Sequence, residues 1–135
     1  MLFTLEIEGK ERTFNFGMKF VREIDALNVI EVDNGVKQKV GLTYALAGVV
    51  SKEPQDIANI LYYGSKCAGE NLTQAEIDAY IEDVEDFDKL CEDLESFFAK
   101  SNCTRTTMTQ VQEQAAHTLE VQKIQREREK TIARG

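Results

Sequence analysis

Residues 2–25, LFTLEIEGKERTFNFGMKFVREID, contain two patterns of apolar residues, one directly after the other. Up to Phe16, apolar residues alternate with polar ones, which is the period of half-buried β-strands. From Gly17 onward the apolar residues form a stripe at helical spacing, with charged residues outside it. This stretch therefore predicts a strand, a turn and a second strand, followed at once by an amphipathic helix.

The turn between the two strands is expected at Gly9-Lys10. With these two residues as the turn, Leu5 faces Phe14 and Phe3 faces Phe16, so that the hairpin has one apolar face. A two-stranded hairpin is marginal in water when it stands alone. We therefore expect helices to pack against this face, beginning with the helix that follows Gly17.

The rest of the first 101 residues is expected to be mainly helical. Asn34-Gly35 is a turn signal within a loop or a small second hairpin. Pro54 stands where a first helical turn tolerates proline, and Thr73 with Glu76 fits a capping box at the start of another helix. The stretch 86–98 has the strongest amphipathic pattern. We predict an α+β, mainly α body at residues 1–101, in which the N-terminal β-hairpin packs on about four to five helices.

Residues 102–135 have a different composition. A linker at about 102–109 follows Ser101 and is rich in threonine with one asparagine, and residues 110–134 contain neither glycine nor proline. Helix propensity is high there, but apolar residues are few. We predict a polar, helix-prone tail outside the core. The candidate partner-binding residues form its narrow apolar stripe: Met108, Val111, Ala115 and Leu119.

The charge balance favours a protein partner. The chain has 135 residues, the size of one domain, and a net charge of −8. Residues 1–103 contain ten basic and twenty acidic side chains, whereas residues 104–135 contain six and four. Binding to nucleic acid requires a basic patch, so nucleic acid is not expected as a partner. No run is long and apolar enough to span a membrane, and the charged N-terminus does not resemble a signal peptide, so we expect a cytosolic protein.

The sequence predicts no catalytic, cofactor-binding or metal site. The acidic run at 83–95 lacks the glycine of a calcium-binding loop, and helical spacing places its carboxylates outward. His117 is the single histidine and lies in the polar tail. Cys67, Cys91 and Cys103 form no CxxC pair, and we expect them to be reduced packing thiols.

This order of elements resembles the tail assembly chaperones of long-tailed, siphovirus-type phages and prophages of Gram-positive bacteria. In layout the resemblance covers residues 1–100, and in recognisable pattern it covers residues 1–25. The residues that carry it are Leu5, Ile7, Gly9, Lys10, Phe14, Phe16, Gly17, Phe20, Arg22, Glu23, Ile24 and Asp25.

The resemblance implies a non-enzymatic protein of the host bacterial cytoplasm that is absent from the mature virion. Such a chaperone binds the tape-measure protein, keeps it soluble and promotes assembly of the tail tube around it. A longer product made by ribosomal frameshifting would contact the tail-tube protein, and this chain would match the shorter form. Homo-oligomerisation is left open.

Other readings of the sequence lead to different functions. A connector or scaffold of phage morphogenesis, a generic acidic helical protein-binding module and an immunity or antitoxin-like binder would have a similar composition. An acyl-carrier domain would need a serine directly after an aspartate, and no serine in this chain follows one. A small enzyme would have only pairs of aspartate and glutamate as acids and bases.

Overall fold

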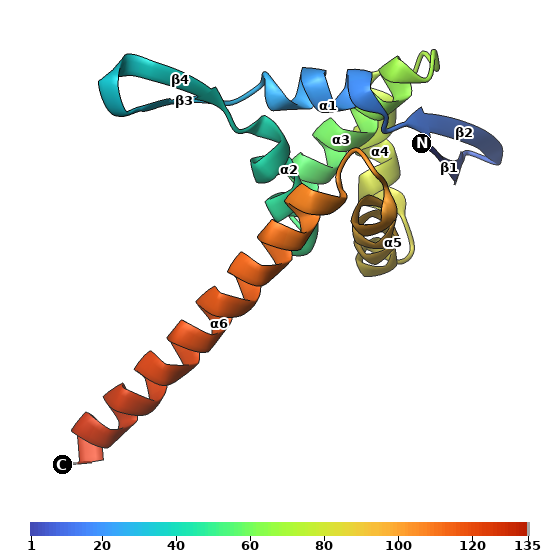
Figure 1. The fold of residues 1–135 in the computed structure, drawn as a ribbon. Coiled ribbons are helices and arrows are strands. Elements are labelled where there is room, and N and C mark those ends of the chain that lie inside the picture. The colour runs from blue at the N-terminus through green and yellow to red at the C-terminus, as the bar shows by residue number, and fades with distance from the viewer. Residues whose placement is uncertain (135) are drawn as a thin grey trace.

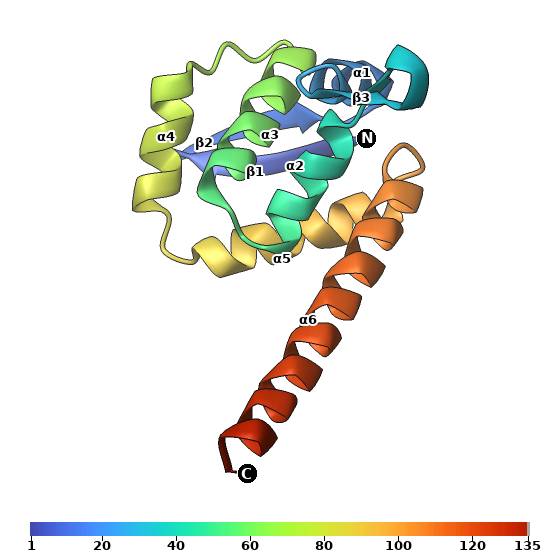
Figure 2. The same ribbon diagram turned by 90° about the vertical axis from the view of Figure 1, so that its left-hand side faces the viewer.

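The computed structural model describes the backbone of residues 1–134 and the side chains of residues 1–128. A β-hairpin at the N-terminus is followed by helices, with a second small hairpin between the first two (Figures 1 and 2). This arrangement confirms the predicted α+β, mainly α class. The elements are β1 (Leu2–Ile7), β2 (Lys10–Asn15), α1 (Met18–Asp25), β3 (Val29–Val32), the short 3-10 turn η1 (Asp33–Gly35), β4 (Val36–Lys39), α2 (Gly41–Val50), α3 (Pro54–Cys67), α4 (Gln74–Asp83), α5 (Phe87–Lys100) and α6 (Arg105–Arg134).

The N-terminal hairpin is present, but its predicted register is wrong. Leu5 pairs with Arg12 and not with Phe14, because the turn is Glu8-Gly9 rather than Gly9-Lys10. Both turn residues have positive φ, 54° and 74°, as a type I′ turn requires, and glycine takes the second position without steric cost. The pairing is displaced by two residues, so the apolar side chains still share one face.

The core forms where this hairpin meets the helices. Phe16 is fully buried, and its ring centroid lies 4.9 Å from those of Phe20 in α1 and Phe98 in α5. The edge of β2 packs against α3, which crosses the hairpin in Figure 2. The aromatic residues of the opening stretch therefore join the first helix to one that is about 80 residues further along the chain.

The first turns of α6 also belong to the core, contrary to the expectation that the tail lies outside it. Met108 is 0% exposed and Val111 is 7% exposed, where α6 packs against α2 and α5. The Thr104 hydroxyl donates a hydrogen bond of 2.7 Å to the Phe98 carbonyl, so the connection between α5 and α6 is fixed as well. The division into a body at 1–101 and a tail at 102–135 stays a prediction.

Two parts of the chain extend from this body (Figure 1). Residues 26–39, which include β3 and β4, are all exposed. Because β3 pairs with β4, the predicted alternative of a small second hairpin around Asn34-Gly35 is confirmed over that of a loop. In α6, every side chain from residue 116 to residue 128 is exposed. Both segments lack the apolar cover that the remaining elements receive.

Candidate partner-binding surfaces

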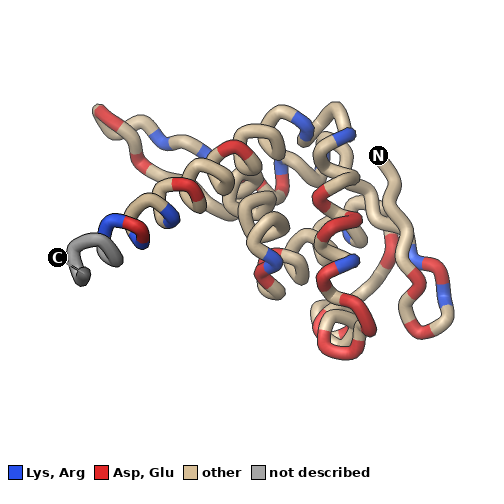
Figure 3. Tube along the Cα trace, turned by 90° about the horizontal axis from the view of Figure 1, so that it is seen from below, with Lys and Arg blue, Asp and Glu red and all other residues tan. Residues whose placement is uncertain are grey.

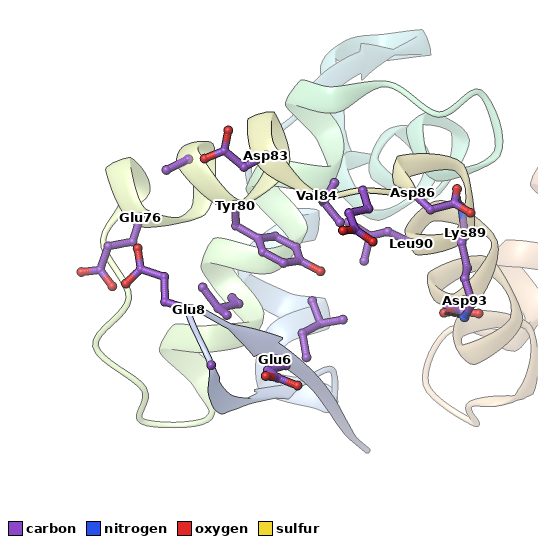
Figure 4. A pocket seen from close by; sticks show the side chains of 15 residues that line it. Glu6, Glu8, Glu76, Tyr80, Asp83, Val84, Asp86, Lys89, Leu90 and Asp93 are labelled. Carbon is purple, nitrogen blue, oxygen red and sulfur yellow. Dashed lines mark hydrogen bonds and ion pairs between the residues drawn. The ribbon is translucent and has the colours of Figure 1, made fainter.

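An open groove of about 700 Å³ lies between β1, α4 and α5 (Figure 4). The side chains of Leu5, Ile7, Tyr80, Val84 and Leu90 supply its apolar surface. Burial raises the pKa of Tyr80, so its hydroxyl stays protonated at neutral pH. The groove is large enough for a peptide segment, and it is open to solvent.

Helix caps position α4 and α5 around this groove. The Thr73 hydroxyl accepts a hydrogen bond from the Glu76 N–H at 3.1 Å, which confirms Thr73 as the N-cap of α4 and one of the two hydrogen bonds of the predicted capping box. Asp86 accepts one from the Lys89 N–H at 3.0 Å. Only residues 84–86 separate the two helices, so α5 starts immediately after α4 ends and the chain bends around the groove.

The groove is strongly acidic. It is lined by seven carboxylates and a single lysine, Lys89, which pairs with Asp93 at 3.1 Å on the same helix. Figure 3 shows that acidic residues are numerous on the body, whereas both signs of charge alternate along α6. The seven carboxylates belong to Glu6, Glu8, Glu76, Asp83, Glu85, Asp86 and Asp93.

The predicted partner-binding residues do not form one exposed surface. Met108 and Val111 lie in the core, Ala115 is half-buried, and Leu119 is 67% exposed. Their spacing places them on one stripe of α6, so the stripe leaves the core and continues into the exposed part of the helix. Partner binding by these residues stays a prediction, and Leu119 is the member that a partner can reach in this conformation.

The distal part of α6 presents two further apolar side chains that were not among the candidates. Val121 is 40% exposed and Ile124 is 48% exposed. They are three residues apart and therefore neighbours on the helix surface, on a different face from Leu119. Both residues are recognisable in the sequence as apolar positions of the polar tail. They were not predicted to bind a partner because they lie off the stripe from Met108 to Leu119.

The β3–β4 hairpin has one apolar and one charged face. Its register pairs Ile30 with Gln38 and Val32 with Val36, so these four side chains share a face. The opposite face contains Val29, Glu31, Lys37 and Lys39. Ile30, Val32 and Val36 are 38%, 39% and 57% exposed, although an apolar face on a two-stranded hairpin normally needs cover.

Among the described residues, no group of three His, Cys, Asp or Glu side chains is placed to hold a metal ion. None of the helices within the described part of the chain combines the length and apolar character needed to cross a membrane. Burial raises the pKa values of the Cys67 and Cys91 thiols, as expected of packing cysteines rather than nucleophiles.

A comparison with protein families gives a match over most of the chain. The family model described as "Phage tail assembly chaperone protein, TAC" matches residues 4–113. No curated protein and no solved structure gave a match. The matched range contains all but the first two residues of the N-terminal hairpin, the groove and the packed first turns of α6, and it ends before the exposed part of that helix.

Proposed function

The chain belongs to the family of phage tail assembly chaperones, and on this basis we propose that it binds the tape-measure protein, keeps it soluble and promotes tail-tube assembly around it. The source would be a siphovirus-type phage or prophage of a Gram-positive bacterium. The chaperone would act without enzymatic activity in the host cytoplasm and would be absent from the mature virion. A long helical tape-measure protein exposes apolar stripes until the tube encloses it, and such surfaces require temporary cover.

The observation that supports this proposal most directly is the course of α6. This helix starts in the core at Met108 and continues as an exposed segment in which Leu119, Val121 and Ile124 are large apolar side chains. An unpacked helix is marginally stable in water and gains stability by packing against another helix. Helix-to-helix docking through apolar anchors is a common form of peptide recognition. We place the tape-measure contact on residues 116–128.

Co-expression with the tape-measure protein tests this assignment. In the triple variant L119D/V121D/I124D the three apolar contacts are lost and three negative charges are added. The matched control T118D/Q122D/Q125D has the same added charge on the same exposed helix segment but retains the apolar side chains. We expect the wild-type chain and the control to keep the tape-measure protein in the soluble fraction, and the triple variant to leave it in the pellet.

The outcomes of that experiment are distinct. If the triple variant keeps the tape-measure protein soluble as well as the control does, distal α6 is not the contact. If neither the wild-type chain nor the control has any effect, the proposed function itself is wrong. Circular dichroism of each purified variant establishes that the body is folded, which is expected because residues 116–128 lie outside the core.

We propose further that a frameshifted, longer product connects this chaperone to the tail-tube protein. This part of the proposal rests on the family alone, because a frameshift signal lies in the coding DNA and cannot be read from the amino-acid sequence. A slippery heptamer near the codons for residues 131–135 and an overlapping second reading frame are expected in the coding DNA. Mass spectrometry of infected cells should find a longer peptide that starts with this sequence. If only the 135-residue product is made, this part of the proposal is wrong.

A further inference from the structure

Strand β1 has an open edge beside the acidic groove. The Phe16 N–H donates to the Met1 carbonyl at 2.9 Å, and hydrogen-bonded pairs alternate along an antiparallel ladder. The backbone groups of Thr4 and Glu6 therefore point away from β2. In agreement with this alternation, the N–H of Thr13, which lies opposite Thr4, donates to Glu70 and not to β1. In Figure 2, β1 is the strand of the hairpin on the α5 side.

Strand β4 has a second open edge, and it is cationic. The Val40 N–H donates to the Asn28 carbonyl at 2.8 Å, so the same alternation turns the backbone groups of Lys37 and Lys39 away from β3. The whole hairpin is exposed and is only two strands wide. Its sequence, with valines and an isoleucine on one face, fits a sheet of more than two strands.

We propose that β4 of a second copy of this chain pairs with the open edge of β1, giving a four-stranded antiparallel sheet in the order β2, β1, β4, β3. Adding a strand to an exposed edge is an established form of recognition, in which backbone hydrogen bonds supply affinity and side chains supply specificity. The inference does not depend on the identity of the tape-measure partner, because it concerns contacts between copies of this chain.

Three properties of the two edges agree in a single register. With Glu6 opposite Lys37 and Thr4 opposite Lys39, the free backbone groups of both strands come into phase. Directly opposed residues share a face, so Glu6 and Lys37 form a cross-strand pair of opposite charge. The same register places Val36 opposite Ile7, so the apolar face of the hairpin joins the apolar side of the groove.

Opposite charges on the groove and on β4 favour β4 as the strand that pairs with β1. The groove is lined by seven carboxylates and one paired lysine, whereas β4 contributes two lysines and no acid. The chain as a whole has a net charge of −8, so two copies repel each other unless opposite charges are brought together locally. The contact joins two different surfaces, and each copy therefore keeps one groove and one hairpin for further copies, as in rings or open filaments.

Analytical ultracentrifugation of the full chain over a concentration series tests the proposal. We expect the wild-type chain to associate, and the variant K37E/K39E to associate about tenfold more weakly, because a like charge then faces Glu6 across the strands and β4 becomes negative beside the acidic groove. K100E/K123E is the matched control, with the same change in net charge at two exposed lysines outside the hairpin, and it should associate like the wild type. The hairpin lies outside the core, so folding of K37E/K39E is not at risk.

Further variants distinguish strand pairing from general electrostatics. E6K/E8K should also weaken association by itself, and an equimolar mixture of E6K/E8K with K37E/K39E should restore it. K37P and K37A both remove the Lys37 charge, but only K37P also removes an N–H from the open edge of β4, one that makes no bond to β3, so K37P should weaken association more than K37A. A wild-type chain that stays monomeric, equal effects of K37E/K39E and its control, or a mixture without restored association would overturn the proposal.

Discussion

The ring of Phe16 lies against Gly64, so closely that a Cβ atom at residue 64 would overlap it. Gly64 lies in the last turn of α3, within the helix, where a glycine otherwise lowers helix stability. The missing side chain allows the helix backbone to approach the end of β2, where Phe16 also contacts Phe20 and Phe98. This contact positions α3 on the N-terminal hairpin, and therefore the surface on which the rest of the body packs.

We predict that G64A destabilises the protein despite the better helix propensity of alanine. Propensity alone would stabilise α3 by about 0.5–1 kcal/mol, whereas overpacking a rigid aromatic cluster costs about 1–3 kcal/mol. Urea unfolding of G64A should show the net loss. The double variant F16L/G64A should lose less than the sum of the two single changes, because leucine leaves room for the new methyl group. Additive losses would contradict the contact.

Glu70 joins the loop after α3 to β2. Its carboxylate accepts one hydrogen bond from the Arg12 guanidinium at 3.1 Å and another from the Thr13 N–H at 3.2 Å. Both hydrogen bonds lower the pKa of Glu70 below its ordinary value of 4.5, and the one from Arg12 has the larger effect. A carboxyl group with a lowered pKa in the folded state stabilises that state above its unfolded-state pKa, and the stabilisation is lost as the pH falls through the folded-state pKa.

E70Q should therefore have a lower Tm than the wild type at pH 7, and the two Tm values should converge as the medium is acidified below the ordinary glutamate pKa. E11Q provides the control, because Glu11 is an exposed glutamate of the same hairpin. Thermal melts monitored by circular dichroism from neutral to acidic pH measure the difference. A gap between wild type and E70Q that is the same at every pH would show that the charge of Glu70 is not involved.

Met108 and Leu119 lie on one stripe of α6 but should respond differently to truncation. Met108 is 0% exposed, so M108A leaves a cavity and should cost about 2–5 kcal/mol. Leu119 is 67% exposed, so L119A should change the free energy of unfolding by less than about 0.5 kcal/mol. Urea titration of both variants measures this contrast. Equal, small effects would mean that the start of α6 is not part of the core in solution.

The sequence could predict local structure where one period dominates. Alternation up to Phe16 and helical spacing after Gly17 were sufficient for the hairpin and α1, and Thr73 was correctly predicted to cap α4. The register could not be derived from the pairing of apolar residues, because it depends on Glu8 and Gly9 both taking positive φ. That requirement belongs to the turn and is not visible in hydrophobic alternation.

Longer-range features were less accessible. The stripe through Met108 was recognised, but its burial depends on the position of α2 and α5, and a narrow stripe fits a packed helix as well as a partner-binding one. The acidity of residues 83–95 was clear, yet the groove also needs β1 at the same place. The open edges of β1 and β4 follow from registers, so neither could be recognised before the pairing was known.

Limited trypsin digestion should divide α6 at the point where it leaves the core. Lys123, Arg126 and Arg128 lie in the exposed segment, where local unfolding exposes the backbone at little cost in free energy. Arg105 is also exposed, but it lies between the buried Thr104 and Met108, so cleavage there requires the helix to detach from α2 and α5. We expect early cleavage at the three distal sites, late cleavage at Arg105, and protection of the distal sites when the tape-measure protein is bound.

Early cleavage at Arg105 would contradict the packed start of α6. Distal sites that are cut equally fast with and without the tape-measure protein would contradict binding through residues 116–128.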